Sequence, residues 1–311
     1  MKITVEMELL SERAQQELAR LITDRNILII LANDNNDEIK EAVADNLNTP
    51  ADVLRRLAQN KNWRVKKAVA RNPNTPTDVL YKFAQDDDLK IAVARNPNTP
   101  TDVLYKFAQD DDLKTVVARN PNTPTDILCE FVKYDDDEIK KAVAGNPNTP
   151  ADVLRKLAQN ENWMVKIAVA GNPNTPIDVL RKLAQNKERY IREAVASNTS
   201  IPTDLLYTLS EDKIWIVKKA IAGNPNAPSD VLRKLAKSKN KQIKDKTISN
   251  PNTPADVLRT FAKNKSWIVK KAVAGNPNTP IDVLQKLAQN KNWRVSDVAI
   301  KNLESNHKRC P

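Results

Sequence analysis

The stretch RNPNTPTDVLYKFAQDDDLKIAVA occupies residues 71–94, and residues 95–118 repeat it with two changes in 24 positions. Self-similarity with a period of about 20 to 50 residues is typical of proteins built from stacked repeats. In such proteins each repeat buries its apolar face only against its neighbours. We therefore expect one elongated body of similar units rather than one large core.

Each repeat opens with a proline, and successive prolines lie 26 residues apart except for two steps of 24, at positions 50, 76, 100, 124, 150, 176, 202, 228, 254 and 280. Thr75-Pro76-Thr77-Asp78 is typical of a helix start, because Pro suits the first helical position and Thr with Asp suits a capping box. The pattern predicts about ten repeats, each with an Asp near the helix start: Asp52, Asp78, Asp102, Asp126, Asp152, Asp178, Asp204, Asp230, Asp256 and Asp282.

Two short helices are predicted in each repeat. In the first, Val53, Leu54 and Leu57 fall on one side at helical spacing. In the second, Val65 and Val69 point inward, and the helix ends before the next Asn-Pro, since a residue before proline avoids the helical region. Helices of under about a dozen residues do not persist alone in water, so stacking must stabilise them.

The repeat resembles the variant leucine-rich repeat, a HEAT-like helical repeat, in segments such as KKAVAGNPNTPADVLRKLA (residues 140–158). The likeness covers roughly residues 49–302. It implies an all-α, right-handed α-solenoid of the armadillo/HEAT kind, with the second helices on the concave side. Family members can carry an N-terminal iron–sulfur module bound by cysteines. Because residues 1–48 contain no Cys, we expect no iron–sulfur cluster here.

The repeats set the predicted domain boundaries. Residues 1–48 are expected to form an N-terminal cap with one degenerate repeat, residues 49–303 the solenoid, and residues 304–311 a polar tail. Terminal repeats of a solenoid need polar outer faces, which is why we expect a cap.

Residue types that support catalysis are scarce. The chain has one histidine, His307, and two cysteines, Cys129 and Cys310, far apart in sequence. No nucleophile–base set or metal-ligand spacing is recognisable, so we predict neither an enzyme, a metal nor a cofactor. The N-terminus lacks a signal-peptide pattern and no apolar run reaches 18 residues, which predicts a cytoplasmic protein without a membrane segment.

Two columns of the repeat are interpreted as structural. Asn follows the second helix in eleven places, from Asn46 to Asn302, and its side chain can bond backbone groups at helix ends and from repeat to repeat. The five Trp share one column, and most Phe fall where that column holds Asp. We interpret the Trp as packing groups that trade volume with Phe, in preference to a platform for stacking bases.

Two other columns are candidates for function. A basic column runs along the second helices: Lys40, Lys66, Lys90, Lys114, Lys140, Lys166, Arg192, Lys218, Lys244 and Lys270. We favour pairing of these lysines with the Asp ladder over a binding role. Arg and Tyr, which are enriched at interface hot spots, share a first-helix column and are the predicted partner-binding residues: Arg55, Tyr81, Tyr105, Arg155, Arg181, Tyr207, Arg233 and Arg259.

Charge is unevenly distributed along the chain. Residues 229–311 hold 18 Lys and Arg against 6 Asp and Glu (+12), whereas residues 1–228 hold 32 against 33 (−1). We predict a non-catalytic scaffold that binds another protein through an extended surface. The alternative is duplex DNA bound at a basic C-terminal concave face, with phosphate contacts from Lys218, Lys219, Lys244, Lys270 and Lys271.

Overall fold

In the computed structural model, residues 11–307 are described, and every regular element among them is an α-helix. The chain divides into two compact units, unit 1 (Met1–Pro150) and unit 2 (Ala151–Pro311). The predicted absence of a signal sequence rests partly on residues 1–10, which lie outside the described residues. Cys310 also lies outside them.

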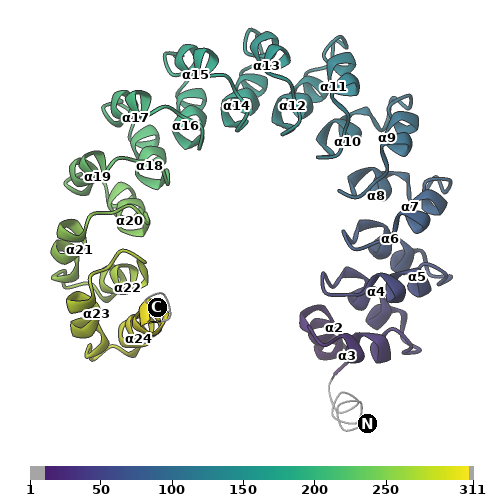
Figure 1. Cartoon of the computed structure of the whole chain (residues 1–311), viewed down its shortest axis with the longest axis horizontal. Helices are drawn as coiled ribbons and strands as arrows, with labels where there is room; N and C mark the ends of the chain where they lie inside the picture. Colours follow the sequence, from purple (N-terminus) through teal and green to yellow (C-terminus); the bar gives the residue numbers. More distant parts are fainter. Residues whose placement is uncertain (1–10, 308–311) are drawn as a thin grey trace. The chain divides into compact units, whose positions relative to one another are not determined.

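Each repeat from α5 on contributes an odd-numbered first helix and an even-numbered second helix (Figure 1). The helices of unit 1 are α2 (Glu12–Leu21), α3 (Arg25–Leu31), α4 (Asp37–Asp45), α5 (Ala51–Leu57), α6 (Trp63–Arg71), α7 (Thr77–Phe83), α8 (Lys90–Arg95), α9 (Thr101–Phe107), α10 (Lys114–Arg119), α11 (Thr125–Phe131) and α12 (Asp137–Gly145). Those of unit 2 are α13 (Ala151–Leu157), α14 (Trp163–Gly171), α15 (Ile177–Leu183), α16 (Arg189–Ser197), α17 (Thr203–Ser210), α18 (Trp215–Gly223), α19 (Ser229–Ala236), α20 (Lys241–Ser249), α21 (Ala255–Ala262), α22 (Trp267–Gly275), α23 (Ile281–Ala288) and α24 (Trp293–His307).

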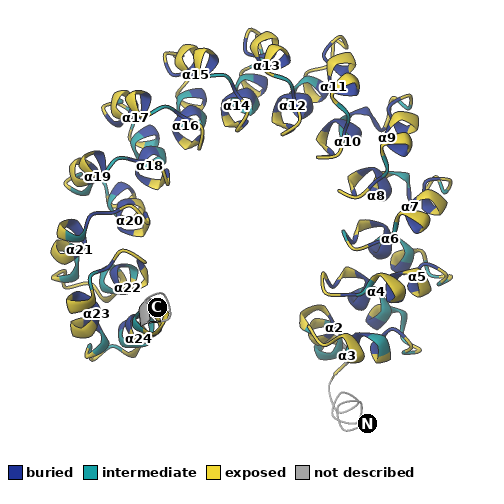
Figure 2. Cartoon of the chain, in the orientation of Figure 1, coloured by how far each residue is buried: buried dark blue, intermediate teal, exposed yellow. Residues whose placement is uncertain are grey.

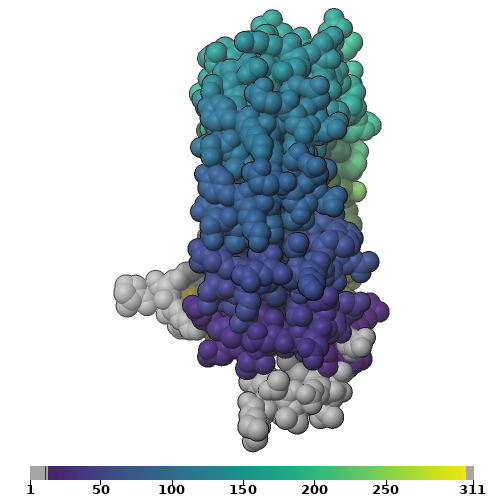
Figure 3. Space-filling model, turned by 90° about the vertical axis from the view of Figure 1, so that its right-hand side faces the viewer, coloured from purple at the N-terminus to yellow at the C-terminus, as the bar shows by residue number. Residues whose placement is uncertain are grey.

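Within each unit the helices form two layers. Second helices pack against one another in chain order, as α14, α16 and α18 do, and each first helix packs on its own second helix. In Figure 1 the second helices lie on the inner side of each unit's row of repeats, which is where HEAT-like geometry would put them. Figure 3 shows repeats of unit 1 following one another in sequence order on one side of the molecule. The predicted α-solenoid of two-helix repeats is confirmed.

The core lies between the two layers and recurs in every repeat. Val53, Leu54 and Leu57 of the first helix and Val65 and Val69 of the second are buried. In Figure 2 the buried residues face the neighbouring helices and the exposed ones face solvent on both layers. Because each helix has only six to nine residues in most repeats, its stability comes from this packing rather than from its own propensity.

The Asn column joins adjacent repeats, as its spacing predicted. The Asn224 side-chain amide donates to the carbonyl oxygens of Ala196 and Asn198 in the preceding repeat, at 2.8 and 3.0 Å. Its own oxygen accepts from the backbone N–H of Asn226 at 2.8 Å. The same two-carbonyl pattern is formed by Asn72, Asn96, Asn120, Asn146, Asn198, Asn250, Asn276 and Asn302.

The predicted capping box is wrong. The residue that caps α7 is Pro76, and no side chain caps that helix. Thr75 is buried and donates its hydroxyl backward, to the carbonyl oxygen of Val69 near the end of α6. Thr75 therefore ties the end of the second helix to the loop that follows it, and Asp78 is left to face outward from the first turn of α7.

At the C-terminal end, the last helix is longer than the sequence predicted. Helix α24 runs from Trp293 to His307, so residues 304–307 of the expected polar tail are helical. No helix within residues 11–307 combines the length and the apolar character that crossing a membrane requires.

Candidate binding surface

The Arg and Tyr side chains predicted to bind a partner each hold the Asp of the next repeat. Arg55 donates to Asp78 at 3.1 Å, and Tyr81 donates its hydroxyl to Asp102 at 2.9 Å. The column continues with Tyr105–Asp126, Arg155–Asp178, Arg181–Asp204, Tyr207–Asp230, Arg233–Asp256 and Arg259–Asp282. These contacts link neighbouring first helices, and the Arg side chains stay about half exposed.

The electrostatics of this ladder follow from the same contacts. The Arg233 guanidinium, hydrogen-bonded to Asp256, holds the pKa of that carboxyl below its usual range. Where the partner is Tyr105, the carboxylate of Asp126 raises the pKa of the phenol, because it accepts the phenolic proton and repels the phenolate. The Arg partners therefore favour the ionised form of Asp78, Asp178, Asp204, Asp256 and Asp282, and each of these pairs joins one repeat to the next.

The basic column of the second helices does not pair with the Asp ladder, so that prediction is wrong. Lys90 and Lys114 form ion pairs with Asp87 and Asp111 in the turn just before their own helix. Lys140 does the same with Asp135, and Lys40 pairs with Asp37, the first residue of its own helix α4. The ladder is out of their reach because it starts the first helices, whereas these lysines lie on the flank of the second.

The Trp residues are not packing groups, and the proposed exchange of volume with Phe is wrong. All five Trp side chains are between 40% and 67% exposed, whereas Phe83, Phe107 and Phe131 are at most 3% exposed. Trp63 is the first residue of α6, and one and two turns later the same side of the helix carries Lys67 and Arg71. Because charged residues follow Trp63 at intervals of four residues, the sequence alone indicates that Trp63 lies on the solvent side of α6.

Cations lie against several of these indole rings. The Lys219 ammonium is 5.5 Å from the ring centre of Trp215. The Arg294 guanidinium lies 5.6 Å from the ring of Trp267 and 4.9 Å from that of Trp293. Such cation–π contacts hold positive charge over the aromatic faces.

The Trp column differs between the two units. In unit 1 its residues are mostly acidic: Asp37, Trp63, Asp87, Asp111 and Asp137. In unit 2 Trp alternates with a cation until the last step, and all six side chains are exposed: Trp163, Arg189, Trp215, Lys241, Trp267 and Trp293. We call this set the Trp/cation column of unit 2.

Helix polarity makes the unit 2 column unusual. The N-terminal end of a helix favours acidic side chains by about 0.3–1 kcal/mol each. Unit 1 follows this rule in α4 and α12, whose first turns carry two acids each. None of α14, α16, α18, α20, α22 and α24 has an acid in its first turn. Helix stability therefore does not explain why the second helices of unit 2 begin with Trp or a cation.

The five lysines predicted to bind phosphate lie on the second helices of unit 2, but not together on its open face. Lys218, Lys244 and Lys270 are half-buried on the helix flanks, whereas Lys271 is exposed. Lys219 is half-buried because it covers Trp215 and donates to the Gln242 side chain at 3.4 Å.

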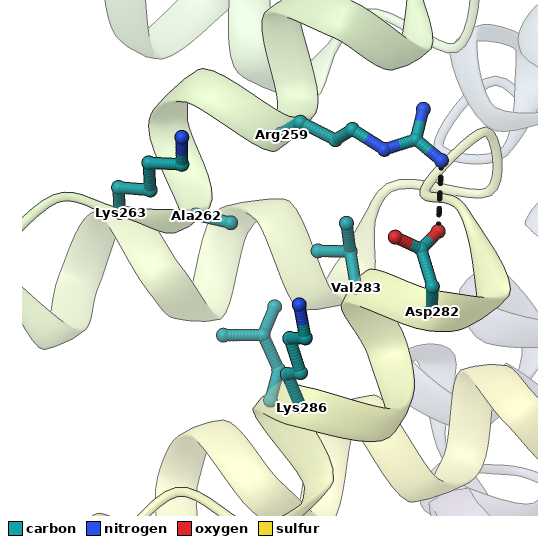
Figure 4. A pocket seen from close by; sticks show the side chains of 7 residues that line it. Arg259, Ala262, Lys263, Asp282, Val283 and Lys286 are labelled. Carbon is teal, nitrogen blue, oxygen red and sulfur yellow. Dashed lines mark hydrogen bonds and ion pairs between the residues drawn. The ribbon is translucent and has the colours of Figure 1, made fainter.

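Two surface pockets of unit 2 lie on different layers. One of about 350 Å³ lies between α21 and α23 on the first-helix layer, beside the Arg259–Asp282 ion pair (Figure 4). It is lined by Arg259, Ala262, Lys263, Asp282, Val283, Lys286 and Leu287. The other, of about 220 Å³, lies on the second-helix layer, between Glu193, Lys219 and Lys246 and beside Gly223.

The described residues contain no group of three or more His, Cys, Asp or Glu arranged to hold a metal ion. Cys129 is an exposed free thiol. It takes the place that Arg or Tyr holds in eight other repeats, from Arg55 to Arg259, and that Gln285 holds in the last repeat.

Layered helix pairs joined by Asn and Asp contacts define an α-solenoid repeat protein. The family model described as leucine rich repeat variant matches residues 63–88, which span one repeat period. Residues 63–88 thus match a repeat of the leucine-rich repeat variant type, and the resemblance drawn from the sequence is confirmed. No curated protein is similar enough in sequence to match the chain.

Among solved structures, the chain is similar to a leucine-rich repeat variant with a novel repetitive structural motif, at 18% identity and a TM-score of 0.43, over 70% of this chain and 84% of that one. An engineered protein matches at 17% identity and a TM-score of 0.35, over 96% and 97%. A designed armadillo repeat protein in complex with the peptide (KR)4 matches at 12% identity and a TM-score of 0.13, over 89% and 97%.

Proposed function

We propose that this protein is a non-catalytic scaffold that binds another protein through the second-helix layer of unit 2. The observation that carries the proposal is the row of half-exposed Trp side chains at Trp163, Trp215, Trp267 and Trp293. Covering about 100 Å² of one such ring contributes ~2.5 kcal/mol at about 25 cal/mol per Å². Trp is also among the residues most enriched at interface hot spots.

Two other repeated columns already have structural partners. The Asp side chains of the ladder are bonded to Arg or Tyr where the preceding repeat carries one, and the Asn column is bonded to backbone carbonyls. The single histidine is the last residue of α24. A recognition role therefore fits the exposed residues better than a catalytic one.

A peptide-display library tests the proposal directly. The full chain, immobilised through its C-terminus, should enrich binding peptides, and a variant with Trp163, Trp215, Trp267 and Trp293 changed to Ala should lose them. The matched control is Trp63→Ala, which removes an equally exposed Trp from unit 1. Enrichment that is the same on both variants would place binding elsewhere, and absence of any enrichment would overturn the scaffold proposal.

Within the same proposal, the first-helix layer is the rival surface. Arg155, Arg181, Arg233 and Arg259 are about half exposed even when paired with Asp, so a partner can still reach their guanidinium groups. If these arginines bind the partner, Arg233→Gln and Arg259→Gln should weaken the binding of the selected peptides more than the Trp substitutions do.

Nucleic acid remains the second candidate because of the charge of unit 2. Unit 1 holds 21 Lys and Arg against 25 Asp and Glu (−4), and unit 2 holds 29 against 14 (+15), which together give +11. A DNA-binding face would lose affinity steeply as salt rises, and Lys244→Glu with Lys270→Glu and Lys271→Glu would abolish it. The scaffold proposal predicts no duplex binding at about 150 mM salt.

A further inference from the structure

Small residues end the second helices of unit 2. The last helical positions of α14, α16, α18, α20 and α22 hold Gly171, Ser197, Gly223, Ser249 and Gly275, all exposed. In unit 1, by contrast, α6, α8 and α10 end in Arg71, Arg95 and Arg119, although α4 ends in Asp45 and α12 in Gly145. We call the five residues the small-residue column of unit 2.

The fold itself does not require these glycines. None of the glycines in the described chain has a positive φ, so none is needed for a left-handed turn. A Cβ at Gly171 would meet nothing within 4 Å, and at Gly223 and Gly275 it would make ordinary contacts of 3.6 and 3.5 Å. Glycine in a helix costs roughly 0.5–1 kcal/mol relative to Ala. The fold therefore does not explain why the backbone at these three positions is exposed to solvent without a side chain.

The two columns of unit 2 run side by side along the same layer. They are separated by eight residues of each helix, which is about 12 Å at 1.5 Å per residue. The pocket beside Gly223 and Ser197 lies at the small-residue column and is also lined by Lys219, which lies midway between the two columns. Large side chains therefore protrude from the surface along the Trp/cation column, and the surface is lower along the small-residue column.

Between the columns the charge alternates. The positions one turn after the Trp/cation column are Ile167, Glu193, Lys219, Asp245, Lys271 and Asp297. A phosphate backbone laid along this face would meet three carboxylates. The Trp faces are also partly covered by Lys219 and Arg294, which leaves less of them for stacked bases. This pattern favours a polypeptide over a nucleic acid.

Helix spacing matches one kind of extended chain. Neighbouring packed helices lie about 8–10 Å apart. A polyproline-II segment advances about 3.1 Å per residue and turns once in three residues, so every third side chain points the same way about 9 Å further on. One residue in three would then face each step of the Trp/cation column.

From these features we infer that unit 2 binds an extended, polyproline-II-like polypeptide in which apolar and acidic residues alternate at every third position. The apolar side chains contact Trp163, Trp215 and Trp267, and the acidic ones contact Arg189 and Lys241. The partner's remaining side chains and main chain lie over the small-residue column, where an arginine like those of unit 1 would block them. This inference rests on the scaffold proposal and specifies the partner's chemistry.

The test is fluorescence anisotropy with the full chain and a labelled 15-residue peptide, Leu-Pro-Ser-Glu-Pro-Ser twice followed by Leu-Pro-Ser. A second peptide has Lys in place of Glu, and a 15-nucleotide oligo-dT probes single-stranded nucleic acid. The Glu peptide should bind at least tenfold more tightly than the Lys peptide, and oligo-dT should bind more weakly than the Glu peptide.

Three variants locate the site, each checked for folding by circular dichroism. Arg189→Glu with Lys241→Glu should reverse the preference between the Glu and Lys peptides. Gly223→Arg with Gly275→Arg should weaken binding of the Glu peptide at least tenfold. Arg is compatible with this helix end, because α6, α8 and α10 of unit 1 end in Arg. Trp63→Ala in unit 1 should change affinity less than twofold.

Several outcomes would overturn the inference. They are equal binding of the two peptides, no effect of the unit 2 variants, binding of oligo-dT alone, and binding of none of the probes. In each case the scaffold proposal stands or falls separately, because the display library can still enrich a peptide of other chemistry.

Discussion

At the scale of single residues, the buried Asn side chains bind the repeats together. Asn224 is 2% exposed and satisfies two carbonyl oxygens of the preceding repeat. Asn224→Ala would take the side-chain partner from the Ala196 carbonyl and the Asn226 N–H, at about 1–3 kcal/mol for each unsatisfied group, whereas the Asn198 carbonyl still accepts from the backbone N–H of Ile201. We expect a loss of roughly 3 kcal/mol in unfolding free energy, measured by urea denaturation.

The neighbouring Asn226 supplies the control. Its side chain donates to the Thr199 carbonyl in an exposed position. Asn226→Ala should cost less than about 1 kcal/mol, because water replaces an exposed hydrogen bond. A loss as large as that of Asn224→Ala would contradict the role given to burial.

The Arg–Asp ladder predicts how stability depends on pH. Arg partners hold the pKa values of Asp178, Asp204 and Asp256 below the ordinary 3.8. The stability that these groups contribute is fully present above pH 3.8 and is lost as the pH falls through their lower folded-state pKa values. We therefore compare the unchanged chain with a variant in which Arg155, Arg181 and Arg233 are changed to Gln. Between pH 6 and pH 2.5, the melting temperature of the variant should fall by less than that of the unchanged chain. An identical loss would show that the ladder is not coupled to folding.

Some of these residue roles were predictable from the repeat columns alone. The structural role of the Asn column was predictable, because an Asn repeated at the ends of the second helices is well placed to bond the backbone groups there. The partners of Asp78 and Asp204 were not, because Arg55 and Arg181 lie one repeat earlier and pairing between columns depends on the offset between stacked helices. The exposure of Trp163 and Trp215 was predictable from their place relative to Val165 and Val217, and the volume argument obscured it.

At the scale of the helices, glycine at exposed ends is a cost that substitution can remove. Gly171 has ordinary helical backbone and open space around it. Gly171→Ala should raise the unfolding free energy by about 0.5–1 kcal/mol, because it restricts the unfolded chain and suits the helix. Gly145→Ala in unit 1 has the same surroundings and should behave alike. Destabilisation by either change, measured by urea denaturation, would mean that the fold does need glycine there.

Helix boundaries were predicted well where proline sets them and poorly elsewhere. Every first helix starts just after its proline, as at Pro202 and Pro228. The capping box failed because the Thr hydroxyl finds a nearer carbonyl behind it, as Thr75 does at Val69. Local sequence did not reveal that competitor, since it depends on how the loop folds back.

At the scale of the whole molecule, net charge and the residues of the Trp column differ between the two units. Unit 1 carries −4 and mostly Asp in the column where unit 2, with +15, carries Trp and cations. The sequence predicted the solenoid from its period alone, because stacked repeats are the way in which such short helices bury their apolar faces. The proposed binding surface was missed because the Trp residues were assigned to packing, although their place on the second helices indicates the solvent side.

The most direct test of the unit 2 surface uses its own Trp side chains as reporters. The chain, labelled with 5-fluorotryptophan, has five Trp residues whose ¹⁹F signals can be assigned by single substitutions. On saturation with the 15-residue Glu peptide or a display-selected peptide, we expect the signals of Trp163, Trp215 and Trp267 to shift and that of Trp63 to stay in place. A bound peptide that shifts Trp63 alone, or that leaves all five signals unchanged, would contradict the assignment of binding to unit 2.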